Sequence, residues 1–84
     1  MNPMRVIKEI PHPECKITIF AWNQKFLIKF ERGLCEQTFK VSQLEVPDVG
    51  KIEARLTAPF LSGILQRFEE MHAALYPSLF ESHS

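Results

Sequence analysis

Several residue types that support particular chemistries are scarce in this chain of 84 residues, which has three glycines, two cysteines and a single aspartate, Asp48. Three scattered glycines exclude the recognised glycine-rich phosphate-binding loops. Two cysteines are too few for a disulfide framework. Ten basic and ten acidic side chains cancel, so the chain has no overall charge that would attract a polyanion.

Long apolar runs are also absent, because the longest span only a few residues, whereas a membrane-spanning helix needs about 20. Charges at Arg5, Lys8 and Glu9 interrupt the N-terminal sequence, so it has no apolar core of signal-peptide length. We therefore expect a cytoplasmic protein that does not insert into a membrane. A length of 84 residues leaves room for one domain, residues 1–84, with one core.

The most regular feature that the chain does have is an alternation of apolar and polar residues between positions 15 and 41. Its segments are rich in β-branched and aromatic residues, which favours strands. Two dipeptides with turn composition, Asn23-Gln24 and Arg32-Gly33, separate them. The sequence therefore predicts a three-stranded antiparallel meander, with strands CKITIFAW (15–22), KFLIKFER (25–32) and LCEQTFKV (34–41).

The register of the first hairpin follows from its turn. A two-residue turn at 23–24 places Ile19 opposite Ile28 and Ile17 opposite Phe30. Apolar side chains of both strands then share one inner face, as a half-buried sheet requires.

The second hairpin is expected to turn at residues 32–33, which places Lys29 opposite Glu36 on the outer face. Opposite charges across strands contribute a few tenths of a kcal/mol. The same register puts Gln37 on the inner face, where its polar amide has no evident role.

Two helices are predicted after the strands. Pro47-Asp48 begins a short one, and Thr57 is placed to cap the N-terminus of a longer one, with proline in its first turn. Apolar and aromatic residues recur in the longer helix at helical spacing. Pro77 is expected to end this helix and to leave 77–84 as a frayed tail. The residues of the predicted apolar stripe are Phe60, Leu61, Ile64, Leu65, Phe68, Met71, His72 and Leu75.

Strands followed by helices indicate an α+β fold in which the helices cover one face of the sheet. We predict the order β-β-β-α-α, with both C-terminal helices on the inner face. Residues 1–13 are expected to be an extended N-terminal segment that Pro11 and Pro13 keep out of a helix.

The stretch IPHPECKI places His12 and Cys15 three residues apart, which resembles half of a zinc motif. A zinc site needs about four ligands, usually as two short-spaced pairs, and no second pair follows. Cys15 and Cys35 lie on strands that the middle strand separates, which is too far for a disulfide. We predict structural thiols, no metal site and no cofactor.

Nucleophilic catalysis would need a thiol or hydroxyl beside a histidine. Cys35 with His72 is the one combination that this fold could bring together, and it leaves a thiol-dependent enzyme as a minor hypothesis. Otherwise we assign no catalytic residues and expect no enzymatic activity.

The outer face of the predicted sheet is the strongest candidate for function. If Ile17 and Ile19 point inward, Phe20 and Trp22 point outward, with Leu27 opposite Phe20. Clustered aromatics of this kind mark interaction surfaces when they are exposed. Cover by the N-terminal segment or by Leu79 and Phe80 is an equally weighted alternative. The candidate interaction face consists of Phe20, Trp22, Lys25, Leu27 and Lys29.

Two functions fit this face. The first is a non-enzymatic protein-interaction module, whose partner is another protein or a second copy in a homodimer. The second is single-stranded nucleic-acid binding, because aromatics with surrounding lysines on a sheet can stack bases. Zero net charge makes the second hypothesis weaker.

The central run FAWNQKFLIKFERGLCEQTFKV, residues 20–41, resembles short bacterial proteins of unknown function. The resemblance covers about a quarter of the chain and implies no chemistry.

Overall fold

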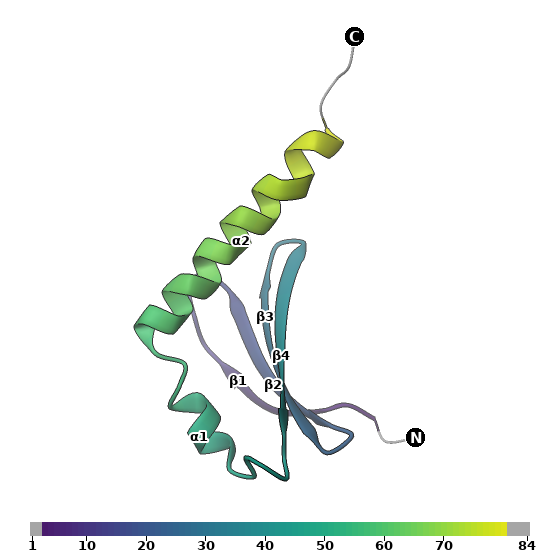
Figure 1. The fold of residues 1–84 in the computed structure, drawn as a ribbon, viewed down its shortest axis with the longest axis vertical. Helices are drawn as coiled ribbons and strands as arrows, with labels where there is room; N and C mark the ends of the chain where they lie inside the picture. Colours follow the sequence, from purple (N-terminus) through teal and green to yellow (C-terminus); the bar gives the residue numbers. More distant parts are fainter. Residues whose placement is uncertain (1–2, 81–84) are drawn as a thin grey trace.

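A computed structural model of the protein describes residues 3–80, which form one four-stranded sheet and two helices. Both helices lie on the same side of the sheet (Figure 1) and contribute side chains to one core. The predicted α+β class is therefore confirmed. The antiparallel strands, in their order across the sheet, are β1 (Arg5–Ile10), β2 (Lys16–Trp22), β3 (Lys25–Arg32) and β4 (Cys35–Ser42); the helices are α1 (Val49–Glu53) and α2 (Ala58–Leu79).

The prediction of three strands was wrong, because residues 5–10 of the predicted extended segment form β1 and pair with β2. A β-bulge between Val6 and Lys8 inserts an extra residue, so Ile7 and Ile10 both pack against the core. Inward residues three positions apart do not show the two-residue period of a regular strand. The bulge thus hid the strand from a search for alternation.

The first hairpin has the predicted register, with Ile19 opposite Ile28 and Phe20 opposite Leu27. Asn23 and Gln24 form its turn with φ values of 52° and 60°. Two positive φ angles are those of a type I′ turn, whose twist matches the flanking strands.

The second turn lies at Gly33-Leu34 rather than at residues 32–33, because Arg32 pairs with Cys35. Of the two residues in this second turn, only Gly33 has a positive φ, 59°. A turn with a positive φ at its first central residue, which is usually glycine, is of type II′. Lys29 therefore faces Thr38 and not Glu36. Its ammonium nevertheless reaches the Glu36 carboxylate on the diagonal, at 3.2 Å.

The core lies between the inner face of the sheet and the two helices. Each fully buried aliphatic or aromatic side chain stabilises the fold by about 1.5–3 kcal/mol relative to its exposed state. The three phenylalanines Phe30, Phe39 and Phe60 contact one another at the β4 side of this core, with ring centroids 5.8–6.1 Å apart. The buried core residues are Cys15, Ile17, Ile19, Phe26, Ile28, Phe30, Ile52, Ile64 and Phe68.

Gln37 has a role that its polar side chain concealed in the sequence. Its amide nitrogen donates to the Ile64 carbonyl of α2 at 2.9 Å, and its amide oxygen accepts from Arg67 Nε at 3.1 Å. A polar residue on the inner face thus fixes where α2 crosses β4. These hydrogen bonds offset the cost of placing an amide at the edge of the core.

Both predicted helix starts are confirmed. The Asp48 carboxylate caps α1 by accepting from Gly50 N–H at 2.9 Å. The Thr57 hydroxyl caps α2 by accepting from Phe60 N–H at 3.4 Å.

The predicted end of the second helix was wrong, because α2 continues through Pro77 to Leu79. Proline is costly inside a helix since it lacks an N–H and crowds the carbonyl four residues before it. Here only two helical residues follow it, and Ser78 Oγ donates to the Leu75 carbonyl at 2.7 Å. The proline is therefore tolerated in the last turn. Residues 81–84 of the predicted tail lie outside the described residues.

The predicted apolar stripe of α2 packs on the sheet only in the first half of the helix. Ile64 and Phe68 are buried, whereas Met71 is 37% exposed and Leu75 is 50% exposed. A helix of 22 residues is about 33 Å long, while a strand of eight reaches about 27 Å. Residues 69–79 of α2, which we call the overhang, extend past the end of the β3–β4 hairpin (Figure 1).

Candidate functional site

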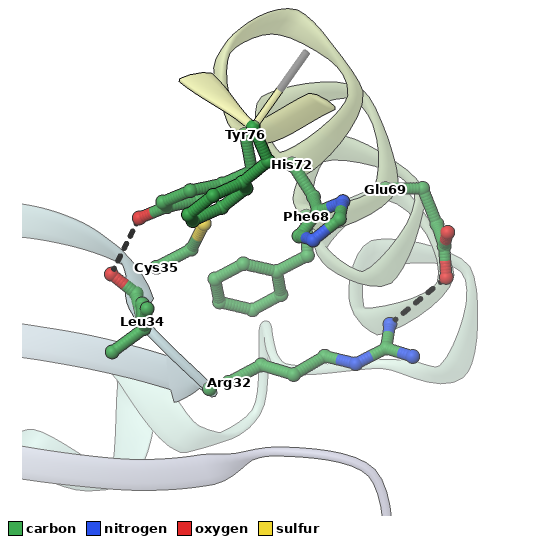
Figure 2. Close-up of a pocket in the computed structure, with 9 residues that line it drawn as sticks. Arg32, Leu34, Cys35, Phe68, Glu69, His72 and Tyr76 are labelled. Atoms are coloured by element: carbon green, nitrogen blue, oxygen red, sulfur yellow. Dashed lines mark hydrogen bonds and ion pairs between the residues drawn. The ribbon is translucent and has the colours of Figure 1, made fainter. Parts of the chain in front are cut away.

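A groove of about 480 Å³ lies between the overhang and the turn of the β3–β4 hairpin. Figure 2 shows its side chains, which come from α2 on one side and from the hairpin on the other. We call it the hairpin groove. It is lined by Arg32, Gly33, Leu34, Cys35, Phe68, Glu69, His72, Tyr76 and Phe80.

Hairpin geometry places the floor of this groove. Arg32 and Cys35 flank the two-residue turn and face each other across the strands. The register of the first hairpin sets Cys15 at the same level, beside Arg32. The three inward side chains therefore form one row at the end of the sheet, and the overhang passes above it.

Two contacts join the overhang to the hairpin, and a third orders the side chains of the overhang itself. Arg32 Nη1 lies 3.3 Å from Glu69 Oε1. The Tyr76 hydroxyl donates to the Leu34 carbonyl at 3.4 Å, and the His72 ring lies against the Tyr76 ring with centroids 5.1 Å apart. These contacts are few and exposed, so they orient the overhang without burying it.

The phenol of Tyr76 lines the groove and has a raised pKa. Partial removal from water raises the pKa of its phenol, and the charge and hydrogen bonding of Cys35 raise it further. The phenol is therefore neutral at physiological pH and acts as a hydrogen-bond donor.

Large apolar side chains surround the groove and are turned to solvent. Leu34 at the hairpin turn is 86% exposed, and Phe80 at the end of α2 is 80% exposed. Met71, Leu75 and Leu79 extend this surface along the overhang. Several exposed apolar side chains beside a groove are typical of interaction sites.

The groove brings Cys35 and His72 together, as the thiol hypothesis required. Within residues 3–80, however, Glu69 is engaged by Arg32 and no hydrogen bond joins Cys35 to His72. A thiol nucleophile needs a base in hydrogen-bonding contact and a group that orients the base. The hypothesis of a thiol-dependent enzyme stays a prediction without geometric support.

His12 and Cys15 lie at the opposite side of the same sheet end. His12 Nδ1 accepts from the Glu14 N–H at 3.1 Å and lies 3.9 Å from Cys15 Sγ. Burial raises the pKa of the Cys15 thiol, the Glu14 carboxylate raises it further, and Arg32 partly opposes both. Both cysteines are free, and no three metal-ligating side chains converge in the part of the chain that the structure describes.

The predicted interaction face lies on the outer side of the sheet, but most of it is not open. Leu27 is only 8% exposed and Phe20 is half-buried, whereas Trp22 is 38% exposed. Lys25 is exposed opposite Trp22. Lys29 lies within 4 Å of the carboxylates of both Glu31 and Glu36. Of this face, Trp22 and Lys25 are the accessible pair.

Sequence reasoning found His72 and Cys35 but missed the hairpin groove. The missing signal was available in part, because the apolar period of α2 continues to Leu79, longer than the strands can cover. Pro77 obscured it by suggesting an earlier end of the helix.

Comparison of the chain with protein-family models, with curated proteins and with solved structures gave no match. The resemblance to short bacterial proteins therefore stays a prediction. Among the described residues, neither helix combines the length and apolar character needed to cross a membrane.

Proposed function

We propose that this protein is a non-enzymatic protein-interaction module that binds an apolar segment of another protein in the hairpin groove. The observation that carries this function is the exposed apolar surface of the overhang beside a preformed groove. Leu75 and Leu79 are 50% and 60% exposed, and exposed apolar side chains that cluster in this way mark surfaces that a partner covers.

The chemistry of the groove defines the kind of segment that fits. Its walls are the aromatic rings of Phe68, His72 and Tyr76, and the ion pair of Arg32 with Glu69 closes one end. Aromatic walls with a few polar groups are typical of sites that take apolar anchors. We expect a partner that inserts leucine or an aromatic side chain.

The outer face remains a second candidate surface for the same function. Trp22 and Lys25 are accessible there, but burial of Leu27 reduces the apolar area that a partner could reach. Nucleic-acid binding by that face is less favoured, because Lys29 already has carboxylate neighbours. Stacking of bases would rest on Trp22 with few free cations around it.

Site-specific photo-crosslinking tests the groove as the binding surface. A photoreactive phenylalanine analogue replaces Leu75 in the overhang or, as the matched control, Gln66 on the solvent side of α2. We expect discrete adducts of one partner from the position 75 protein in a lysate of the native host. Leu75→Glu in a tagged chain should abolish recovery of the same partner, with an unchanged circular dichroism spectrum.

Two results would count against the groove. Equal adducts from positions 75 and 66 would indicate non-specific contact. A partner captured equally by wild type and by Leu75→Glu, but lost with Trp22→Ala, would move the function to the outer face.

A further inference from the structure

Within the described residues, no strand pairs with the free edge of β4. Glu36, Thr38 and Lys40 are all exposed, and β4 pairs with β3 over eight residues without a bulge. The opposite edge, β1, is interrupted by a bulge between Val6 and Lys8. Bulges protect edges from pairing, whereas a long regular edge is a template for a new strand.

Backbone groups of alternate β4 residues point away from the sheet. The two residues that flank a two-residue turn form a hydrogen-bonded pair, in which each N–H donates to the carbonyl of the other residue. Hydrogen-bonded and non-hydrogen-bonded pairs then alternate along the two strands. Arg32 and Cys35 flank the turn, so Glu36, Thr38 and Lys40 direct their N–H and C=O groups to the free edge. Ser42 follows the same pattern, since its carbonyl accepts from Val46 N–H at 2.9 Å beyond the edge.

The charges along this edge are complementary to themselves. If two β4 strands pair antiparallel with Thr38 opposite Thr38, Glu36 of each copy faces Lys40 of the other. Both charges stand on the outer face, two residues either side of the centre. Within the described residues Lys40 has no ion pair of its own, while Glu36 is paired only with Lys29. Opposite charges facing each other stabilise a strand pair and specify its register.

The inner side of the same pairing covers exposed aromatic area. Phe39 is 42% exposed at the edge and borders an apolar groove of about 390 Å³ between β4 and the helices. In the register centred on Thr38, Phe39 faces Gln37 of the other copy and lies diagonal to its Phe39. Diagonal aromatic side chains are within reach of each other.

We propose that two copies of this chain associate through β4, antiparallel about a two-fold axis at Thr38, to form one continuous sheet. The interface is isologous, so each contact between two different residues occurs twice. It uses a surface separate from the hairpin groove and does not depend on the function proposed for that groove.

Charge exchange between the two positions tests both the surface and the register. The molar mass in solution should be about 20 kDa, twice the 9.8 kDa of one chain. Glu36→Lys alone and Lys40→Glu alone each place like charges opposite each other twice, which should weaken association about 10–100-fold. The double variant Glu36→Lys/Lys40→Glu restores opposite charges and should associate like wild type.

Mixing the two single variants gives a sharper result. A heterodimer of Glu36→Lys with Lys40→Glu has one pair reversed in sign and one pair unchanged, and both pairs attract. The mixture should therefore dimerise although each component alone is mostly monomeric. Arg5→Glu on the β1 edge is the matched control and should leave the dimer intact.

Light scattering with size exclusion reads the mass, and circular dichroism confirms that each variant folds. A monomeric wild type at about 100 μM, or a dimer insensitive to both single variants, would overturn the β4 interface. Failure of both the double variant and the mixture to associate would overturn the register.

Amide exchange on the wild type gives a test that needs no variant. The N–H groups of Glu36, Thr38 and Lys40 should be protected in concentrated protein and should lose protection on dilution. Rapid exchange of all three in a sample that light scattering shows to be dimeric would contradict pairing through β4.

Discussion

The two halves of α2 share one apolar period but have opposite environments. Residues 58–68 place Ile64 and Phe68 in the core, at 0% and 3% exposure. Residues 69–79 continue the same apolar period with Met71 and Leu75, which remain exposed. The difference lies in what is beneath the helix, because the overhang meets only the hairpin turn, through exposed contacts of Glu69 and Tyr76. Helical periodicity shows which side of a helix is apolar, and the neighbouring element decides whether that side is buried.

A consequence is that the two halves contribute differently to stability and to binding. The first half supplies core contacts, and its loss removes buried apolar area. The overhang supplies surface, and we expect that its side chains can be changed without unfolding the domain. A helix longer than its sheet is thus a structural way to present an apolar surface on a small domain.

Truncation of one apolar side chain in each half should give the largest contrast. Ile64→Ala removes buried methyl groups and should lower the free energy of unfolding by about 2–5 kcal/mol. Leu75→Ala acts on an exposed side chain and should change it by less than about 0.5 kcal/mol. Urea denaturation measures both. A comparable loss in Leu75→Ala would show that the overhang is covered in solution.

Removal of polar contacts should also destabilise the protein more in the first half of α2 than in the overhang, but by smaller free energies of unfolding. Gln37→Ala removes both hydrogen bonds that fix α2 on β4, and should cost about 1 kcal/mol. Glu69→Ala removes the ion pair of the overhang, whose side chains are 42% and 71% exposed, and should cost at most about 0.5 kcal/mol. Thermal unfolding of the two variants ranks them. If Glu69→Ala lost more stability than Gln37→Ala, the overhang and not the first half of α2 would contribute more to the stability of the domain.

The smallest effect is expected from pH, through the one phenol of the chain. The pKa of Tyr76 is raised in the folded state, so the unfolded chain releases this proton first, above about pH 10. The contribution of Tyr76 to stability is therefore full below that pH and falls as the pH rises through its folded pKa. Because the chain has one tyrosine, absorbance at 295 nm follows it alone.

Tyr76→Phe provides the control for this titration. The variant should lack the part of the alkaline destabilisation that follows the phenol absorbance. An absorbance midpoint at or below that of a model peptide would contradict the contact between Tyr76 and the hairpin.

Sequence reasoning succeeded where local chemistry decides the structure. Asn23 and Gln24 tolerate the positive φ of a tight turn, and the parity of the apolar residues around them fixed the first hairpin. Asp48 and Thr57 marked the helix starts because short polar side chains satisfy the first N–H groups of a helix. In each case the signal lies within a few residues.

Sequence reasoning failed where the interaction that decides the structure joins residues that are distant in the sequence. Gln37 looked misplaced until the carbonyl of Ile64 was brought to it from α2. The second turn was predicted one residue too early. Turns at Arg32-Gly33 and at Gly33-Leu34 leave the same residues of β4 on the inner face, so the alternation of apolar residues cannot distinguish them. The candidate site shares this property, since the hairpin and the overhang are more than thirty residues apart.

The sequence by itself determined the class of the fold, the inner face of the central strands and the apolar side of α2. These follow from local propensity and from periods of two and 3.6 residues. The tertiary structure alone decided that β1 joins the sheet, that α2 outlasts it and that the hairpin groove forms. Those outcomes depend on how far each helix or strand extends over its neighbour. The length of this overlap is not encoded by any local sequence pattern.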